Sequence, residues 1–224
     1  MTRYVSPKIE SMTRKELLDL QFKKLIFFLE RVYRENPYWR EKFDKARVDL
    51  KKIKGIDDFR HAIPFSDKKS ILEDQEAFPM YGKRLGVPLV DVTEFHLSSG
   101  TSGLAQEVHS YTAEDVELSG TVLLYHYIWA GLQKGDAVAI TWPLSTTGFP
   151  LAAFSAIRKL GGKPFMIGAF DNKTRLETMH RFPIKYVFVT PVYLTRLVEV
   201  CEEMGVVPGD YLSTLTTIGL SAGS

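Results

Sequence analysis

Apolar residues recur with helical spacing along the first third of the chain. Thr13 and Glu16 form a capping-box pattern, in which hydroxyl and carboxylate satisfy the free amides at a helix start. The apolar stripe that follows, with charged residues largely on other faces, consists of Leu17, Leu18, Leu20, Leu25, Phe28, Leu29 and Val32. The pattern predicts a long amphipathic helix that ends at Asn36-Pro37.

Shorter elements are expected between this helix and position 90. An aromatic helix containing Tyr38, Trp39 and Phe43 should follow the proline, and the segment Val48 to Ile63 shows little periodicity. Ser66 is predicted to cap a helix over Asp67 to Asp74. We therefore expect residues 1–90 to form a helical N-terminal region that packs on the core.

From about Val90 the pattern changes to short β-branched or aromatic runs that alternate with longer helical segments. The predicted strands are Val92–Leu97, Glu107–Tyr111, Ala137–Trp142, Lys163–Ile167, Lys185–Thr190 and Thr216–Leu220. The predicted helices are Ala113–Leu132, Phe149–Leu160, Asn172–Arg181 and Pro191–Met204, with Gly161 and Gly205 at helix ends. Strands separated by helices predict an α/β fold with a mainly parallel sheet and helices on both faces, over residues 91–224.

Composition limits the classes of partner. The 224 residues are 45% apolar and 25% charged, with a net charge of +2, which is too small to predict binding to nucleic acid or to an anionic membrane surface. The apolar run Leu118 to Leu132 is shorter than the ~20 residues that span a bilayer, and Met1 to Ser11 lacks the apolar core of a signal peptide. Together with a single cysteine, Cys201, these features favour a cytoplasmic protein.

One stretch carries candidate chemistry. Six consecutive small residues, Ser98, Ser99, Gly100, Thr101, Ser102 and Gly103, lie between two predicted strands, and four of them bear hydroxyls. Glycines permit close approach of backbone to a ligand, and hydroxyls and exposed amides supply hydrogen-bond donors, so the stretch is a candidate phosphate cradle. It is not a P-loop, because Leu104 stands where that motif requires lysine. A flexible hairpin loop remains the alternative.

The surrounding motifs favour the first interpretation. The run Phe95 to Gly103 resembles the phosphate-binding signature of adenylate-forming enzymes, most of all the phenylacetate-CoA ligase branch. Further matches occur in the same order as in that branch: Tyr38 to Phe43, Ile63 to Lys68, Gly131 to Asp136, Thr147-Gly148, Lys159 to Gly162 and Thr190 to Leu194. The resemblance extends from about Pro37 to the last residue, and the hydroxyl-rich loop is its most specific part.

Two departures qualify the resemblance. Gln106 stands where many members of the superfamily have lysine, although the phenylacetate branch commonly lacks it. The family's adenine-side motif would fall on Ser221-Ala222-Gly223-Ser224, without its acidic residue. The ribose-binding Asp, the aromatic-Gly-x-Thr-Glu segment and the catalytic Lys are not found, so we expect the chain to correspond to the N-terminal part of such an enzyme.

The resemblance implies a reaction and a set of site residues. The family activates a carboxylic acid with ATP and Mg²⁺, forms an acyl-adenylate, and transfers the acyl group to coenzyme A. Thr101 and Ser102 would donate to phosphate oxygens, while Gly100 and Gly103 supply backbone amides. A small or aromatic acid would lie near the ends of the later strands, where parallel sheets bind ligands. By position the candidate residues are Trp142, Thr146, Thr147, Gly148, Phe149, Thr190, Pro191, Ser221, Ala222 and Gly223.

The remaining reactive side chains have ordinary interpretations. The five histidines show no metal-binding spacing, and His126, inside an apolar helix, is expected to be partly buried. Cys201 lies on a predicted amphipathic helix and is expected to be a buried thiol.

Two other functions stay open. A non-catalytic nucleotide-binding or scaffold protein could retain the loop without the rest of the enzyme. An acyltransferase or hydrolase with a loop serine is less favoured, because no Gly-x-Ser-x-Gly elbow is present. If Thr216 to Leu220 ends the sheet, its open edge predicts either self-association as a homodimer or cover from the N-terminal helices.

Overall fold

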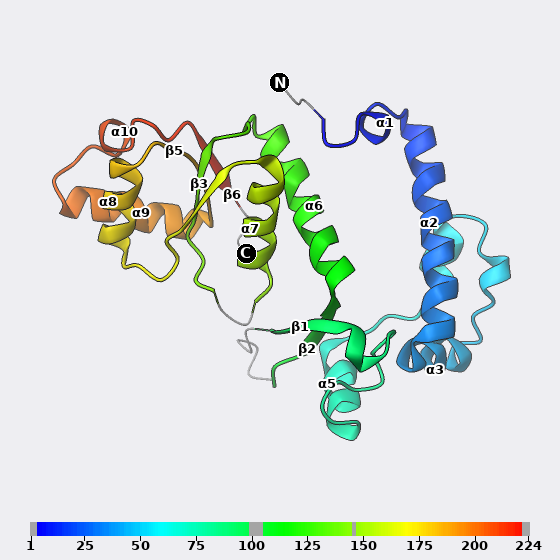
Figure 1. The fold of residues 1–224 in the computed structure, drawn as a ribbon. Coiled ribbons are helices and arrows are strands. Elements are labelled where there is room, and N and C mark those ends of the chain that lie inside the picture. Colours follow the sequence, from blue (N-terminus) through cyan, green and yellow to red (C-terminus); the bar gives the residue numbers. More distant parts are fainter. Residues whose placement is uncertain (1–3, 99–104, 145–146, 221–224) are drawn as a thin grey trace. The chain divides into compact units, whose positions relative to one another are not determined.

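The computed structural model describes residues 4–98, 105–144 and 147–220. The chain divides into two compact units, one formed by Ser6–Glu114 and the other by Met1–Val5 with Asp115–Ser224. Figure 1 shows the elements along the chain. The predicted division at residue 90 remains a prediction, and the boundary between the compact units falls at Glu114 and Asp115.

The first unit is mainly helical. Its helices are α1 (Pro7–Glu10), α2 (Arg14–Glu35), α3 (Pro37–Lys45), α4 (Ile56–Ala62) and α5 (Lys68–Ala77), with short 3₁₀ turns at Leu50–Lys52 and Leu89–Asp91. The capping box is confirmed: Glu16 N donates to the Thr13 hydroxyl, and Thr13 N donates to the Glu16 carboxylate. Buried Leu29, Phe43 and Ile53 form the core of this unit.

Two predictions for this unit were wrong in detail. The cap of α5 is Asp67, whose carboxylate accepts from Ser70 N at 2.7 Å, whereas the Ser66 hydroxyl bonds to the buried Tyr38 hydroxyl. Asp is as good an N-cap as Ser, so two adjacent candidates could not be separated by type. Helix α4 was missed because it is short and its cap, Gly55, makes no side-chain bond.

The first two strands form a separate hairpin. Strands β1 (Val92–Leu97) and β2 (Val108–Thr112) pair antiparallel, with Leu97 opposite Val108. The prediction had placed both runs among the strands of a mainly parallel sheet. Only residues 98–107 connect them, fewer than the dozen or more that a crossover between parallel strands needs, so the two strands pair as a hairpin in a two-stranded sheet of their own.

The second unit contains the parallel sheet. Its strands β3 (Ala137–Ile140), β4 (Lys163–Met166), β5 (Ile184–Val189) and β6 (Thr217–Leu220) lie in the order β4-β3-β5-β6 and all pair parallel. The helices are α6 (Ala113–Trp129), α7 (Phe149–Leu160), α8 (Asn172–Arg181), α9 (Pro191–Glu203) and α10 (Pro208–Tyr211). The α/β fold with a parallel sheet and a helical N-terminal region is confirmed.

Helices cover both faces of this sheet (Figure 1). Val138 and Ile140 of β3 pack with residues of α6 and α7, whereas Ala137 and Ala139 pack with residues of α8 and α9. This alternation is the two-residue period of a strand, and burial on both faces explains why β3 is apolar at every position. Gly161 ends α7 with φ +75°, as predicted.

Strand β6 lies at the edge of the described sheet, next to β5 alone. This edge is therefore open among the described residues, and the side chains of Ile218 and Leu220, on one face of β6, are exposed. The predicted self-association stays a prediction. No helix in the described ranges is long and apolar enough to cross a bilayer.

Gly219 of β6 is required by its neighbour on β5. A Cβ built at Gly219 would lie 1.8 Å from the Tyr186 hydroxyl and 2.5 Å from the Phe188 ring. We expect Gly219→Ala to lower the free energy of unfolding by about 1–3 kcal/mol in urea titrations, because a buried site without room must displace one of these rings.

Gly209→Ala is the matched control, since no atom lies within 4 Å of its added Cβ. It should leave the free energy of unfolding within about 0.5 kcal/mol of the parent value, as surface substitutions usually do. Equal free energies of unfolding for the two variants would contradict the prediction, because β6 would then shift away from Tyr186 without cost.

Candidate functional site

The hydroxyl-rich stretch forms the connection of the β1–β2 hairpin. Ser98 is the last described residue before it and Ala105 the first after it. Ser99, Gly100, Thr101, Ser102 and Gly103 lie outside the described residues. The structure therefore defines the stem from which this loop starts and to which it returns.

Three hydrogen bonds close that stem. Ser98 N donates to Glu107 O at 3.0 Å, and Glu107 N donates to the Ser98 hydroxyl at 2.9 Å. The Gln106 side-chain amide donates to Ser98 O at 3.0 Å. One lone pair of the Ser98 hydroxyl is thus used inside the stem. Gln106, at the position where many adenylate-forming enzymes have lysine, contributes to closing the loop.

Gln75 of α5 extends the hairpin as a neighbouring strand would. Its side-chain carbonyl accepts from Val108 N at 3.0 Å, and its side-chain amide donates to Gln106 O at 3.2 Å. These are outward-pointing backbone groups at the start of β2 and just before it, which a third strand would otherwise bind. The helix therefore fixes the return side of the loop through a single side chain.

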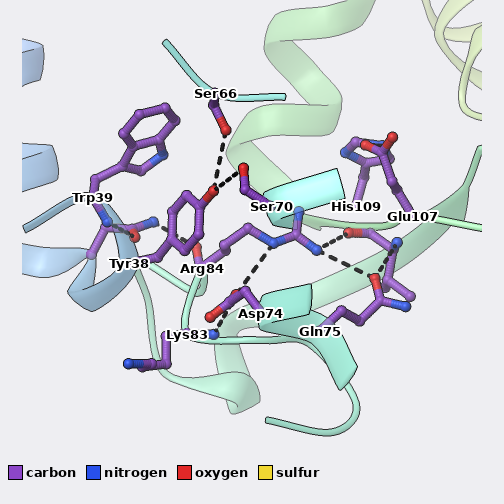
Figure 2. A network of polar contacts seen from close by, with 12 residues as sticks. Tyr38, Trp39, Ser66, Ser70, Asp74, Gln75, Lys83, Arg84, Glu107 and His109 are labelled. Atoms are coloured by element: carbon purple, nitrogen blue, oxygen red, sulfur yellow. Dashed lines mark hydrogen bonds and ion pairs between the residues drawn. The ribbon is translucent and has the colours of Figure 1, made fainter. Parts of the chain in front are cut away.

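A buried cation reinforces the same contact (Figure 2). The Arg84 guanidinium donates to Val108 O at 3.3 Å and to the Gln75 side-chain carbonyl at 3.4 Å. Its Nε lies 3.7 Å from the Asp74 carboxylate, and the two side chains are 16% and 6% exposed. Asp74 in turn accepts from Lys83 N at 2.9 Å. Removing either partner of such a buried pair is costly because the other charge stays buried.

We call Asp74, Gln75 and Arg84 the hairpin brace. Sequence reasoning missed all three, since each appears on its own as an ordinary surface residue type. Only the fold brings α5, the turn after it and β2 together. The one available signal was Asp74 and Gln75 adjacent at the end of a predicted helix, which does not indicate a partner.

The ends of the later strands hold the other predicted residues. Trp142, Phe149 and Phe188 form an aromatic cluster with ring-centroid distances of 4.8, 5.5 and 5.4 Å. Gly148 is the N-cap of α7, and Thr147 precedes it. Thr146, Ser221, Ala222 and Gly223 lie outside the described residues. The structure thus brings together Trp142 and Phe149 from the predicted acyl set.

A cavity of about 180 Å³ adjoins this cluster at the carboxyl ends of β3 and β5. Its lining consists of Thr141, Trp142, Pro143, Arg175, Thr190 and Tyr193. Trp142 and Thr190 were predicted near a ligand, whereas Arg175 was not. Arg175 lies on α8, far from both in sequence, so spacing could not have indicated it.

A polar contact is buried on the face of the sheet that α6 and α7 cover, next to Phe188. The half-buried His126 ring bonds to the Tyr186 hydroxyl, and the buried Tyr127 ring packs edge-on against Tyr186. Burial lowers the pKa of the His126 imidazole below its ordinary value and raises the pKa of both tyrosines. The predicted partly buried histidine is confirmed, and its neutral ring is matched to a neutral phenol.

Neither the Cys201 thiol nor a cluster of metal-ligating side chains adds a reactive site among the described residues. Cys201 is 1% exposed on α9, and burial raises the pKa of its thiol, which favours the unreactive protonated form. Among the residues that the structure describes, no cluster of three His, Cys, Asp or Glu side chains could hold a metal ion.

Comparisons with known proteins agree with the motifs. No family model matches the chain. It is 28% identical over 200 residues to a phenylacetate-coenzyme A ligase of Aromatoleum evansii, covering 89% of this chain and 44% of that protein. It is 28% identical over 215 residues to the enzyme of that name from Thermus thermophilus, covering 95% and 46%. The chain spans about half the length of these curated relatives.

The fold agrees as well. A solved structure of 2-hydroxyisobutyryl-CoA ligase, in an open conformation with 2-HIB-AMP and CoA, superposes with a TM-score of 0.90 at 21% identity, over 99% of this chain and 51% of that one. This likeness shows the fold, and the resemblance that the motifs indicated is confirmed by the phenylacetate-coenzyme A ligases.

The hairpin brace generates a local prediction. We expect Gln75→Ala to speed hydrogen exchange of the Val108 amide roughly tenfold or more, because that amide loses its acceptor, a loss of about 1–3 kcal/mol. Amide exchange followed by NMR measures it. Glu76→Ala, the exposed next residue on α5, is the control. Unchanged exchange at Val108 would show that Gln75 does not hold the stem.

The histidine contact generates a prediction about pH. Because the folded-state pKa of His126 is lowered, the unfolded chain binds more protons as pH falls through the ordinary value of 6.5. The free energy of unfolding should therefore decrease between pH 7.5 and pH 5.5, and His126→Gln should flatten this decrease in urea titrations at the two pH values. The exposed His61→Gln serves as control, and a slope that His126→Gln leaves unchanged would contradict the assignment.

Proposed function

We propose that this chain belongs to an acid–thiol ligase that activates a small or aromatic carboxylic acid with ATP and transfers the acyl group to coenzyme A. The observation that carries the proposal is similarity to phenylacetate-coenzyme A ligases over 89% and 95% of the chain, together with the hydroxyl-rich loop at the position of the phosphate-binding signature. The relatives' full activity is proposed for a protein of which this chain spans about half.

The loop is proposed to bind the phosphates of ATP. Thr101 and Ser102 would donate hydroxyl protons to β- and γ-phosphate oxygens, while Gly100 and Gly103 allow backbone amides to approach. Ser98 and Ser99 are the remaining proposed phosphate-binding residues. Support comes from the stem, because its hydrogen bonds and the hairpin brace hold Ser98 and Val108, which lie on either side of the loop.

The proposed reaction has two transfers. A carboxylate oxygen of the acid attacks the α-phosphorus of ATP in line, and the bond to the bridging oxygen breaks, which gives acyl-adenylate and pyrophosphate. The sulfur of coenzyme A then attacks the acyl carbonyl, loses its proton, and displaces AMP. Neither step requires a covalent intermediate on the protein, so the chain's part is to orient groups and to stabilise phosphate charge.

The acid is proposed to lie against the ends of the later strands. Trp142, Thr146, Thr147, Gly148 and the segment Ser221 to Gly223 are the proposed acyl and adenylate contacts. The aromatic cluster of Trp142, Phe149 and Phe188 gives one side of this region an apolar wall, which suits an aromatic or small apolar acid.

Mg²⁺ is proposed to enter with the nucleotide. It prefers phosphate oxygens and water to a cage of protein ligands. The hydroxyl donors of the loop suit phosphate oxygens, and the described residues offer no carboxylate cluster for a resident ion. Mg²⁺ would supply charge neutralisation between the phosphates of the bound nucleotide.

Calorimetry with ATP and Mg²⁺ tests the proposed phosphate site. We expect the parent chain to bind the nucleotide and Thr101→Ala to weaken binding about 10- to 150-fold, because one hydrogen bond to a charged phosphate is worth roughly 1.5–3 kcal/mol. Thr195→Ala, on the exposed side of α9, is a matched control that should bind like the parent. Absence of nucleotide binding by the parent chain would count against the ligase proposal.

A further inference from the structure

The cavity at the carboxyl ends of β3 and β5 lies where open α/β sheets commonly bind ligands. The chain leaves β3 toward α7 on one face of the sheet and leaves β5 toward α9 on the other face. The strand order therefore reverses between these neighbours, and open α/β sheets bind ligands in the crevice outside such a point. The cavity lies within one compact unit, so its geometry depends on no contact between units.

Arg175 is the charged residue of this cavity, and its guanidinium is held in place. Its Nε donates to Ile167 O at 3.2 Å, and one terminal nitrogen donates to Gly168 O at 2.5 Å. The other terminal nitrogen donates to the Tyr193 hydroxyl. Tyr193 is fixed in turn, since its hydroxyl donates to the Asn172 side chain at 2.9 Å. Both carbonyls that Arg175 binds belong to the connection between β4 and α8.

The positive charge of Arg175 has no acidic partner in the described part of the chain. All its acceptors are neutral oxygens, and each ion pair among the described residues involves a different cation. A guanidinium carries five N–H donors, of which three are used here, so two remain. A half-buried cation with neutral acceptors and spare donors beside a cavity favours an anion in that cavity.

Thr190 adds a second donor to the same cavity. Its hydroxyl oxygen accepts from Tyr193 N at 3.1 Å as the N-cap of α9, which leaves the hydroxyl proton for another acceptor. The Thr141 hydroxyl, by contrast, already donates to Phe188 O at 3.2 Å. Arg175 and Thr190 therefore present donors and no acidic group.

We propose that this cavity binds an anionic group of a ligand, with Arg175 as the residue that recognises the charge and Thr190 as a second donor. A volume of about 180 Å³ accommodates one carboxylate or phosphate group with a few neighbouring atoms, well below the ~300–1,000 Å³ of a site for a whole drug-sized ligand. The proposal is independent of the ligase function, because anion binding here needs no nucleotide.

Two sources would supply this chemistry. One is a ligand that carries a carboxylate, and the other is a ligand that carries a phosphate. The planar fork of arginine binds both groups, so the guanidinium alone does not distinguish them. Tighter binding of succinate would assign the first source, and tighter binding of inorganic phosphate the second.

The test is an NMR titration of the whole chain at fixed ionic strength, observing the Arg175 Nε–H and the Trp142 indole N–H. Acetate, succinate and inorganic phosphate are the probes, and acetamide is the neutral isostere of acetate. We expect saturable shifts of both signals with the anions and none with acetamide. Equal shifts with acetate and acetamide, or no saturable shift with any anion, would overturn the proposal without using any variant.

Three variants sharpen the result. Arg175→Met should weaken anion binding at least tenfold, Arg175→Lys should weaken it less because it keeps the charge, and Arg181→Met should bind like the parent. Arg181 is the matched control, since it is exposed on the same helix. A purely structural Arg175 would lower stability in Arg175→Met but leave the anion affinity of the folded fraction unchanged, which would overturn the proposal. Because no ATP is present, failure here leaves the outcome of the ATP titration unaffected.

Discussion

Burial of the β3–β5 pair on both faces is the constraint that sets the arrangement of helices in the second unit. Every side chain of β3 must be apolar, and successive residues must alternate between the core below α6 and α7 and the core below α8 and α9. Once the helices divide between the two faces, the chain has to leave β3 and β5 in opposite directions. The cavity that Trp142, Arg175 and Thr190 line is the space that this divergence leaves.

Much of this architecture could be predicted from local signals. Helices α7 and α8 begin and end at the predicted residues, with Gly161 at the end of α7. The ends of the strands in the parallel sheet were predicted within one or two residues, because these runs are too short for helices and rich in β-branched or aromatic residues. Errors arose where the local signal was ambiguous, as with the adjacent candidates Ser66 and Asp67, or weak, as at α4.

The candidate site was predictable only in part, for a physical reason. The hydroxyl-rich loop and Trp142 were recognisable from composition and position. The groups that hold them act through backbone atoms that the sequence does not display: Gln75 and Arg84 bind the N–H and C=O of Val108, and Arg175 binds the carbonyls that follow β4. A polar side chain with a backbone partner leaves no complementary residue in the sequence, so such contacts appear only with the fold.

The hairpin brace also bears on how the chain avoids aggregation. The outer edge of a two-stranded sheet exposes amides and carbonyls that can pair with a strand of another molecule. Gln75 and Arg84 occupy these groups at Val108 and Gln106 with side chains, which cannot propagate a β-ladder. Next to a loop rich in glycine and hydroxyl residues, these contacts therefore block intermolecular strand addition where β2 begins.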